Sequence, residues 1–426
     1  VALSNFELKN ASINAPIDVK LISSSGGTAF GNFKIYGIYS PYDTNVVLYS
    51  TGATQFNNFS IKNSNFDNIN LELTSYSTLS YGGLGFSNLD IEGVQTKGNL
   101  NILLYNKEGR VAWEDLTIKN SQIGKEFNLD AKGYGLTYEN FNLEGTGIQG
   151  NANLSFYSSY YLQAVNTNIE TSQIAGDLNL LFSDPTIVYG DYATKIGQIN
   201  VESTASNNLN LNVLSNGDII FFDDGIDFQY DQIKNSANFV VYTQHDLFIV
   251  NDLFNIENTS FATNPNVFLL AGKDVGYGYD SFPSAIEQIF NLANDYPEYA
   301  SLYYEILEKN IGDEYFTKDN GQLLSFEKNT TGVNFVTWVK GGDVVAPGGI
   351  DIKDVNTESK LAFWTQGSLY IGDLTYQGVE PPKGLTIDDA EELCKTTSGL
   401  VQQFYCSISG GGATTGSFVV DKWLVD

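Results

Sequence analysis

One pattern is repeated at Asn5-Phe6-Glu7-Leu8, Asn32-Phe33-Lys34-Ile35 and Asn58-Phe59-Ser60-Ile61, and it decides the fold. It recurs in eight segments of the first 214 residues, whose first residues lie 25 to 32 positions apart. These first residues are Asn5, Asn32, Asn58, Asn88, Asp115, Asn140, Asn166 and Gln198. An internal repeat of this length is typical of solenoids, in which neighbouring units stack on one another.

Apolar and polar residues alternate within each segment, and a second alternating stretch such as Leu100/Ile102/Leu104 follows. Several segments also carry an aromatic residue two positions before the asparagine. Alternation with period two predicts strands that bury one face. A unit of about 27 residues is too small to bury its own apolar face, whereas stacked units bury all of them together. The predicted fold is therefore all-β: a parallel β-helix, or solenoid, with a small helical insertion.

The recurring asparagine predicts a structural ladder. Equivalent side chains lie above one another in an in-register stack, and an amide can both donate and accept a hydrogen bond along the axis. Asp115 interrupts the column with a group that only accepts, and Gln198 with a longer side chain. A ladder that binds a ligand is the functional alternative.

The pattern becomes irregular after residue 214. We predict a regular solenoid over 1–214, an irregular solenoid over 215–380 with a helical hairpin at 281–311, and a C-terminal segment over 381–426. That segment holds a short helix starting near Thr386 and a terminal strand at 417–425. The strand-like runs of the second half are Asp218–Phe222, Asn238–Tyr242, Asp246–Val250, Asn266–Leu270, Asn334–Val339, Lys360–Trp364 and Ser368–Gly372.

The two cysteines, Cys394 and Cys406, predict a disulfide, since their number is even and the composition is that of an extracellular protein. Two free buried thiols are the alternative.

Composition excludes several kinds of function. A net charge of −28 repels polyanions, so we expect no nucleic-acid partner. No apolar run is long enough for a transmembrane segment. His245 is the only histidine and no Gly-x-Ser-x-Gly motif is present, so a serine–histidine triad is not predicted and His245 is interpreted as a strand-end residue.

Two clusters are candidate sites. Asp223, Asp224 and Asp227 surround Gly225, and such carboxylates could bind Ca²⁺ or act as acid and nucleophile on a sugar. EF-hand spacing is missing and acidic residues are abundant, so no metal site and no catalytic residue is predicted. Tyr157, Tyr160 and Tyr161 could stack on sugars. A tyrosine patch that lines a turn without a ligand is the commoner arrangement.

The repeat is already under way at Leu3 and Asn5, and methionine is absent even from position 1. We expect a processed N-terminus or a longer chain. Because solenoid ends expose apolar core and unpaired backbone, the first coil must meet earlier residues or the far end of another subunit, which would propagate head-to-tail.

The second half resembles a known family. Asn238–Tyr242, His245–Ile249 and the turn Leu270-Ala271-Gly272-Lys273-Asp274-Val275 are similar to the coils of filamentous-haemagglutinin-like, two-partner-secretion-type surface proteins. The resemblance implies a right-handed parallel β-helix with a role at a bacterial or viral surface and no catalytic residues.

The predicted function is an extracellular, filament-forming or adhesive surface protein that assembles head-to-tail, with host or cell-surface glycans as candidate partners. Two alternatives stay open. One is a carbohydrate-active β-helix such as a tailspike or polysaccharide lyase, with Asp223, Asp224 and Asp227 as the first candidates. The other is a surface-layer subunit whose acidic faces are bridged by Ca²⁺.

Overall fold

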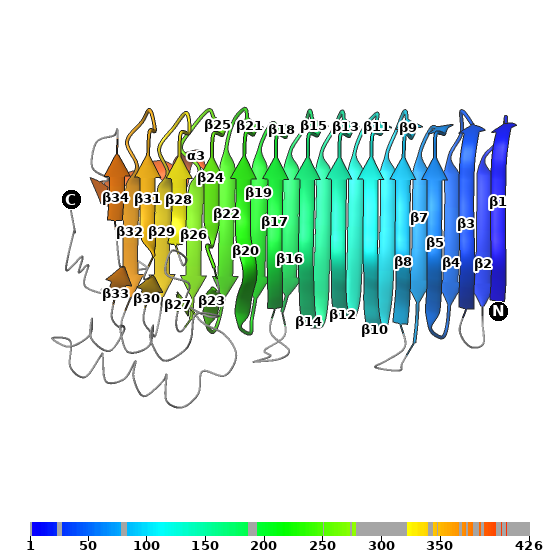
Figure 1. The fold of residues 1–426 in the computed structure, drawn as a ribbon, viewed down its shortest axis with the longest axis horizontal. Coiled ribbons are helices and arrows are strands. Elements are labelled where there is room, and N and C mark those ends of the chain that lie inside the picture. Colours follow the sequence, from blue (N-terminus) through cyan, green and yellow to red (C-terminus); the bar gives the residue numbers. More distant parts are fainter. Residues whose placement is uncertain are drawn as a thin grey trace.

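The computed structural model shows a β-solenoid of stacked coils in which all strand pairing is parallel (Figure 1). It describes residues 2–23, 28–77, 83–185, 194–249, 251–272, 275–277, 322–339, 344–346, 348–365, 369–371, 374–377, 383–384, 387–397, 402 and 406. The predicted fold class is thereby confirmed. The predicted helical hairpin at 281–311 and the terminal strand at 417–425 lie outside the described residues.

Each coil runs up one broad face, across an upper corner and down a second face (Figure 1). Face A contains β1 (Ala2–Ser12), β3 (Thr28–Tyr39), β5 (Thr54–Lys62), β8 (Gly83–Glu92), β17 (Thr194–Glu202), β20 (Ile219–Gln229), β24 (Phe254–Glu257), β28 (Gln322–Glu327), β31 (Gly349–Lys353) and β34 (Leu374–Gln377). Face B contains β2 (Ile17–Ser23), β4 (Thr44–Ser50), β7 (Ile69–Ser75), β16 (Leu178–Asp184), β19 (Leu209–Ser215), β22 (Ala237–Thr243), β26 (Asn266–Ala271), β29 (Asn334–Val339), β32 (Lys360–Thr365) and β35 (Lys383–Gly384). Three long strands pass from face B into face A: β10 (Leu100–Lys119), β12 (Phe127–Glu144) and β14 (Ala152–Glu170).

Short strands close the coils. The upper corner carries β6 (Asn65–Phe66), β9 (Gln95–Thr96), β11 (Gln122–Ile123), β13 (Gly147–Ile148), β15 (Gln173–Ile174), β18 (Ala205–Ser206), β21 (Gln232–Ile233) and β25 (Ser260–Phe261). The lower edge of the later coils carries β23 (Leu247–Ile249), β27 (Val275–Tyr277), β30 (Val344–Ala346) and β33 (Leu369–Ile371). The seven strand runs predicted after residue 214 fall on β20, β22, β23, β26, β29, β32 and β33.

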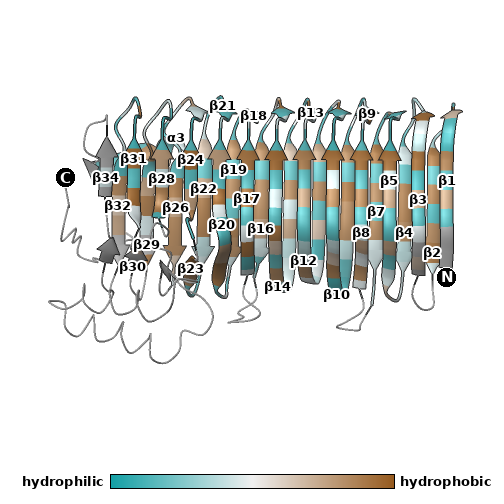
Figure 2. Cartoon of the chain, in the orientation of Figure 1, coloured by the Kyte–Doolittle hydropathy of each residue, from teal (hydrophilic) through white to brown (hydrophobic). Residues whose placement is uncertain are grey.

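Inward side chains of the two faces form one continuous core, and apolar and polar bands alternate along the strands (Figure 2). The residues that follow the repeated asparagine lie in one column, because β1 pairs Phe6 with Phe33, β3 pairs Phe33 with Phe59, and β5 pairs Phe59 with Leu89. The rings of Phe33 and Phe59 are parallel within 6° with centroids 4.6 Å apart, about one strand spacing. Stacking therefore buries aromatic faces that a single coil would leave exposed.

The upper corner is built on a backbone conformation that few residues adopt. One residue per coil has a positive φ there: nine non-glycine residues together with Gly37, Gly93 and Gly145. Asparagine and glycine alternate in the first six coils, and the asparagine side chain fills the space that glycine leaves. A Cβ on Gly93 would lie 2.6 Å from Asn63 Oδ1, so a larger residue at this position would displace that amide.

Two asparagine ladders run along the outside. On face A, the register places Asn5, Asn32, Asn58, Asn88, Asp115, Asn140, Asn166 and Gln198 in one column. Five amides donate to the preceding coil, as from Asn32 Nδ2 to Asn5 Oδ1 over 2.8 Å, and the donors are Asn32, Asn58, Asn88, Asn140 and Asn166. Asp115 accepts from Asn140 Nδ2 at 2.8 Å, but it has no amide group that could donate to Asn88 of the preceding coil. The column ends after Gln198 because its partner in the next coil is Gly225.

The second ladder, on face B, was not predicted and is the longer one. Ten side-chain hydrogen bonds of 2.8 to 3.1 Å connect its eleven residues without a break. The members are Asp18, Asn45, Asn70, Asn101, Asn128, Asn153, Asn179, Asn210, Asn238, Asn266 and Asn334. The bond from Asn334 to Asn266 spans 68 positions of sequence, so the register survives a long excursion of the chain.

The polarity of this ladder predicts the effect of one substitution. Asn128 donates to Asn101 and accepts from Asn153, so Asn128→Asp loses only the donation. We expect a loss of about 1 kcal/mol in the free energy of unfolding at pH 7, measured by urea denaturation. At pH 3 the protonated carboxyl can donate, and the difference from the unchanged protein should shrink. Asn212→Asp, on the same face and without a ladder bond, is the control; equal losses in both variants would contradict the ladder's contribution.

Candidate functional site

The outer surface of face A holds two open grooves. The lower groove has a volume of 530 Å³ over β5, β8, β10, β12 and β14, and its polar lining includes Gln55, Arg110, Thr137, Glu139 and Gln163. The upper groove, of 740 Å³, crosses β3, β5, β8 and β10 nearer the upper corner. Both lie where outward side chains from neighbouring coils stand in columns.

The upper groove is lined by ion pairs between successive coils. Lys62 Nζ lies 2.8 Å from Glu92 and also contacts Asp90, and Lys119 lies 3.7 Å from the other oxygen of Glu92. The hydrogen bonds that Lys62 donates to Asp90 and Glu92 raise the pKa of Lys62, and the bond from Lys62 lowers the pKa of Glu92. The charges balance locally in this part of the face.

The same column becomes acidic further along the solenoid. Register places Glu144, Glu170 and Glu202 directly above one another in three successive coils. Burial raises the pKa of Glu170, and the charges of Glu202 and Glu144 raise it further. Like charges opposite one another destabilise neighbouring strands.

Replacing a glutamate with neutral glutamine should have opposite effects on the free energy of unfolding in these two parts of the column. Glu170 has a raised pKa in the folded chain, so its stabilising contribution is present at low pH and is lost as pH rises through that pKa. Glu170→Gln should therefore raise the free energy of unfolding by about 0.2–1 kcal/mol at pH 7 and change it little near pH 3.

The matched variant is Glu92→Gln. The pKa of Glu92 is lowered, so its contribution is present at neutral pH and is lost as pH falls through the folded pKa. We expect destabilisation of about 0.2–1 kcal/mol at pH 7 that disappears in acid, as for partly exposed ion pairs. Urea midpoints at both pH values measure the two effects, and the same sign for both variants would contradict the assignment.

The acidic candidates lie on β20. Asp223 and Asp224 precede a bulge at which Gly225 adopts φ +66°, and Asp227 follows it. Asp227 accepts hydrogen bonds from Gln229 Nε2 at 3.1 Å and Asn255 Nδ2 at 3.2 Å. Its pKa is raised by burial and by the charges of Asp224 and Glu202. Within the described residues, no group of three histidine, cysteine, aspartate or glutamate side chains is arranged to hold a metal ion.

Asp231 is a buried carboxylate that the sequence did not reveal. It replaces a serine or threonine that caps the neighbouring backbone in other coils, as Ser121 does for the N–H of Val94. Asp231 Oδ1 accepts the N–H of Thr204 at 2.7 Å, and burial raises its pKa well above the ordinary value. The repeat could have identified this position, because Asp231 aligns with Thr204 and Thr259.

The tyrosine candidates separate in the structure. Tyr160 stacks on Tyr134 with ring centroids 4.8 Å apart, and Tyr161 meets Tyr160 edge-on at 6.0 Å. Tyr157 belongs to a different column, opposite Lys132. Tyr134, Tyr160 and Tyr161 form the tyrosine platform. Tyr134 was missed because it precedes Tyr160 by a whole coil.

The C-terminal helix α3 (Ile387–Thr396) packs against the side of the last coils (Figure 1). Outward residues of face B are apolar there, with Val240, Phe268, Val336 and Ala362 in one column beneath Ala390. These strands are thus buried on both sides.

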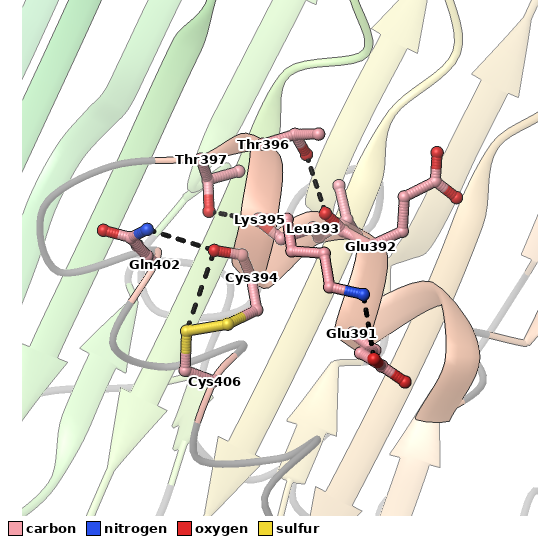
Figure 3. The surroundings of a disulfide bond; sticks show 9 residues. All are labelled: Glu391, Glu392, Leu393, Cys394, Lys395, Thr396, Thr397, Gln402 and Cys406. Atoms are coloured by element: carbon pink, nitrogen blue, oxygen red, sulfur yellow. Dashed lines mark hydrogen bonds and ion pairs between the residues drawn. A yellow bond between two sulfur atoms is a disulfide. The ribbon is translucent and has the colours of Figure 1, made fainter.

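A disulfide joins Cys394 of α3 to Cys406 (Figure 3). Gln402 Nε2 donates to Cys394 O at 3.1 Å, and Lys395 pairs with Glu391 at 2.8 Å. The disulfide and the Gln402 bond connect Cys406 and Gln402 to the helix, and the Lys395–Glu391 pair lies within it. His245 lies at the turn between β22 and β23, where its N–H donates to Thr243 Oγ1 at 2.9 Å.

The fold and its surface define the chain as a parallel β-solenoid repeat protein. Comparison with protein-family models, with curated proteins and with solved structures found no match to this chain. The resemblance to filamentous-haemagglutinin-like proteins therefore stays a prediction. None of the helices among the described residues has the length and apolar character needed to cross a membrane.

Proposed function

We propose that this protein is an extracellular structural β-solenoid that presents an adhesive surface. The observation that carries the proposal is the unbroken ladder on face B, whose ten bonds connect successive coils from outside while the core connects them from inside. Amide ladders of this kind strengthen in-register stacks. A rod held in this way is suited to keep a binding surface at a fixed distance from its support.

Two further features support the location and the adhesive role. The disulfide between Cys394 and Cys406 is of a kind that persists in oxidising compartments. Tyrosines such as Tyr36, Tyr134 and Tyr230 are 40–55% exposed, and amphipathic rings of this type are common in binding surfaces.

The location is tested on the native source. Antibody against the chain should label intact, unpermeabilised cells or their shed material, and an alkylating reagent should modify Cys394 and Cys406 only after reduction. The reason is that glutathione and thioredoxin keep thiols reduced in the cytosol. Labelling confined to permeabilised cells, or alkylation of both thiols without reduction, would contradict an extracellular site.

The proposal extends to head-to-tail self-association. Within the described chain, β1 and β2 pair only with β3 and β4, and Phe6, Leu8, Val19 and Leu21 pack on the core from one side. Their other side can receive an earlier part of a longer chain or the far end of a second copy. Coil-on-coil contact with a second copy would give fibres.

One pair of variants tests this contact. Leu21→Lys places a charge at the end of the core and should abolish fibres seen by negative-stain electron microscopy across a concentration series. Ile22→Lys, at the adjacent residue that is 64% exposed, should leave them intact. Monomers at every concentration in the unchanged protein, or equal effects of both variants, would refute the self-association while leaving the structural role standing.

A further inference from the structure

The lower groove holds the only arginine of the chain, Arg110. Arg110 is exposed, and its Nε donates to Thr137 Oγ1 at 2.7 Å while Nη2 contacts the same oxygen. Within the described residues its partner is this neutral hydroxyl and no carboxylate. The guanidinium is thus held in place by a neutral partner, and its Nη1–Nη2 edge remains available for a second partner.

The backbone around Arg110 is fixed by buried polar groups. Asn106 is 1% exposed, donates to Arg110 O at 3.3 Å and accepts the N–H of Gly109 at 3.2 Å. The strand bulges between Asn106 and Arg110. This bulge sets the position from which the arginine side chain leaves the sheet.

The tyrosine platform adjoins the same groove. Register places Arg110, Gly135 and Tyr161 in one column of successive coils, and Tyr161 lies two residues before Gln163 of the groove. A Cβ on Gly135 would lie 2.4 Å from Tyr161 Cε1, so the ring covers the glycine and reaches toward the coil of Arg110.

One buried hydroxyl pins the platform. Ser158 is fully buried, donates to Tyr134 O at 3.0 Å and accepts the N–H groups of Tyr160 and Tyr161 at 3.2 and 3.0 Å. The two coils that carry the tyrosines are therefore fixed relative to each other. Rigid aromatic anchors of this type bind at low entropic cost.

We propose that the lower groove binds a terminal acidic sugar, with the sugar ring against the tyrosine platform and its carboxylate on Arg110. A guanidinium edge matches a carboxylate, and tyrosine rings present an apolar body beside a polar tip, as a sugar does. Gln163 and Glu139 supply planar polar groups for hydroxyls. The net charge of −28 repels an acidic polymer, which is why the ligand carries a single carboxylate. The inference rests on the adhesive part of the proposed function.

The test uses the full chain and defined probes. Saturation-transfer NMR and titration calorimetry compare methyl glucuronide and the methyl glycoside of N-acetylneuraminic acid with methyl glucoside. We expect at least one acidic probe to bind about tenfold more tightly than the neutral one, since a charge-assisted hydrogen bond is roughly twice as strong as a neutral one. Arg110→Gln should remove this preference, whereas Arg110→Lys should retain part of it. Tyr134→Ser combined with Tyr160→Ser should weaken both kinds of probe.

Controls separate the site from general effects. Lys97→Gln removes an exposed positive charge at the upper corner, and Tyr39→Ser with Tyr42→Ser removes two exposed tyrosines of β3 and its following turn. Both should leave binding unchanged, and circular dichroism checks that every variant folds. Absence of binding of both acidic probes, or acidic binding that survives Arg110→Gln, would overturn the proposal. If antibody labels intact cells but neither acidic probe binds, the proposed sugar site is rejected and the extracellular location still stands.

Discussion

Parallel pairing between equivalent strands of successive coils is the interaction on which the structure depends. A coil of this length has an apolar interior that it cannot cover alone, and the neighbouring coil covers it while satisfying the backbone groups of its strands. Register is kept even where the coil is interrupted: Glu257 pairs with Glu327, 70 positions later. Such an insertion costs little because loop-closure entropy grows only with the logarithm of loop length.

The upper corner explains why the register does not slip. Each coil must turn there through a residue with positive φ, and a shift by one position would place a residue such as the β-branched Val94 in that conformation. Just beyond the corner an inward hydroxyl or carboxylate accepts a backbone N–H of the preceding coil, as Ser121 does for Val94. Sterics and hydrogen bonding thus fix the register of every coil at the upper corner. The chain can therefore vary in length at the lower edge without shifting the register.

Because the inward residues of every coil must pack against the next coil, the coils differ mainly in their outward residues. One outward column of face A changes from the balanced charges of Lys62 and Glu92 to the acidic residues Glu144, Glu170 and Glu202. An outward column of face B changes from a mixture of polar and apolar residues, such as Ser155 and Leu181, to Val240, Phe268 and Val336 where α3 covers it. Arg110 lies on β10, and the tyrosine platform lies on β12 and β14, the strands that end in Glu144 and Glu170. A surface site on a solenoid of this type is therefore built from residues of successive coils, which are neighbours in space but one coil apart in the sequence.

The sequence by itself determined the strands, the period of the coil and the column of Phe6, Phe33 and Phe59, because alternation and equal offsets are local properties that stacking preserves. The face B ladder was also visible in the sequence, because an asparagine such as Asn101 lies between the apolar residues of the second alternating stretch of a repeat. Only the tertiary structure brought Tyr134 to Tyr160 and set Arg110 on Thr137. These contacts join residues about one coil apart through side-chain direction and a bulge at Asn106, which no periodic pattern encodes. The packing of α3 likewise depended on the tertiary structure. The helix covers the part of face B whose outward residues are apolar in several successive coils, and no single coil shows this.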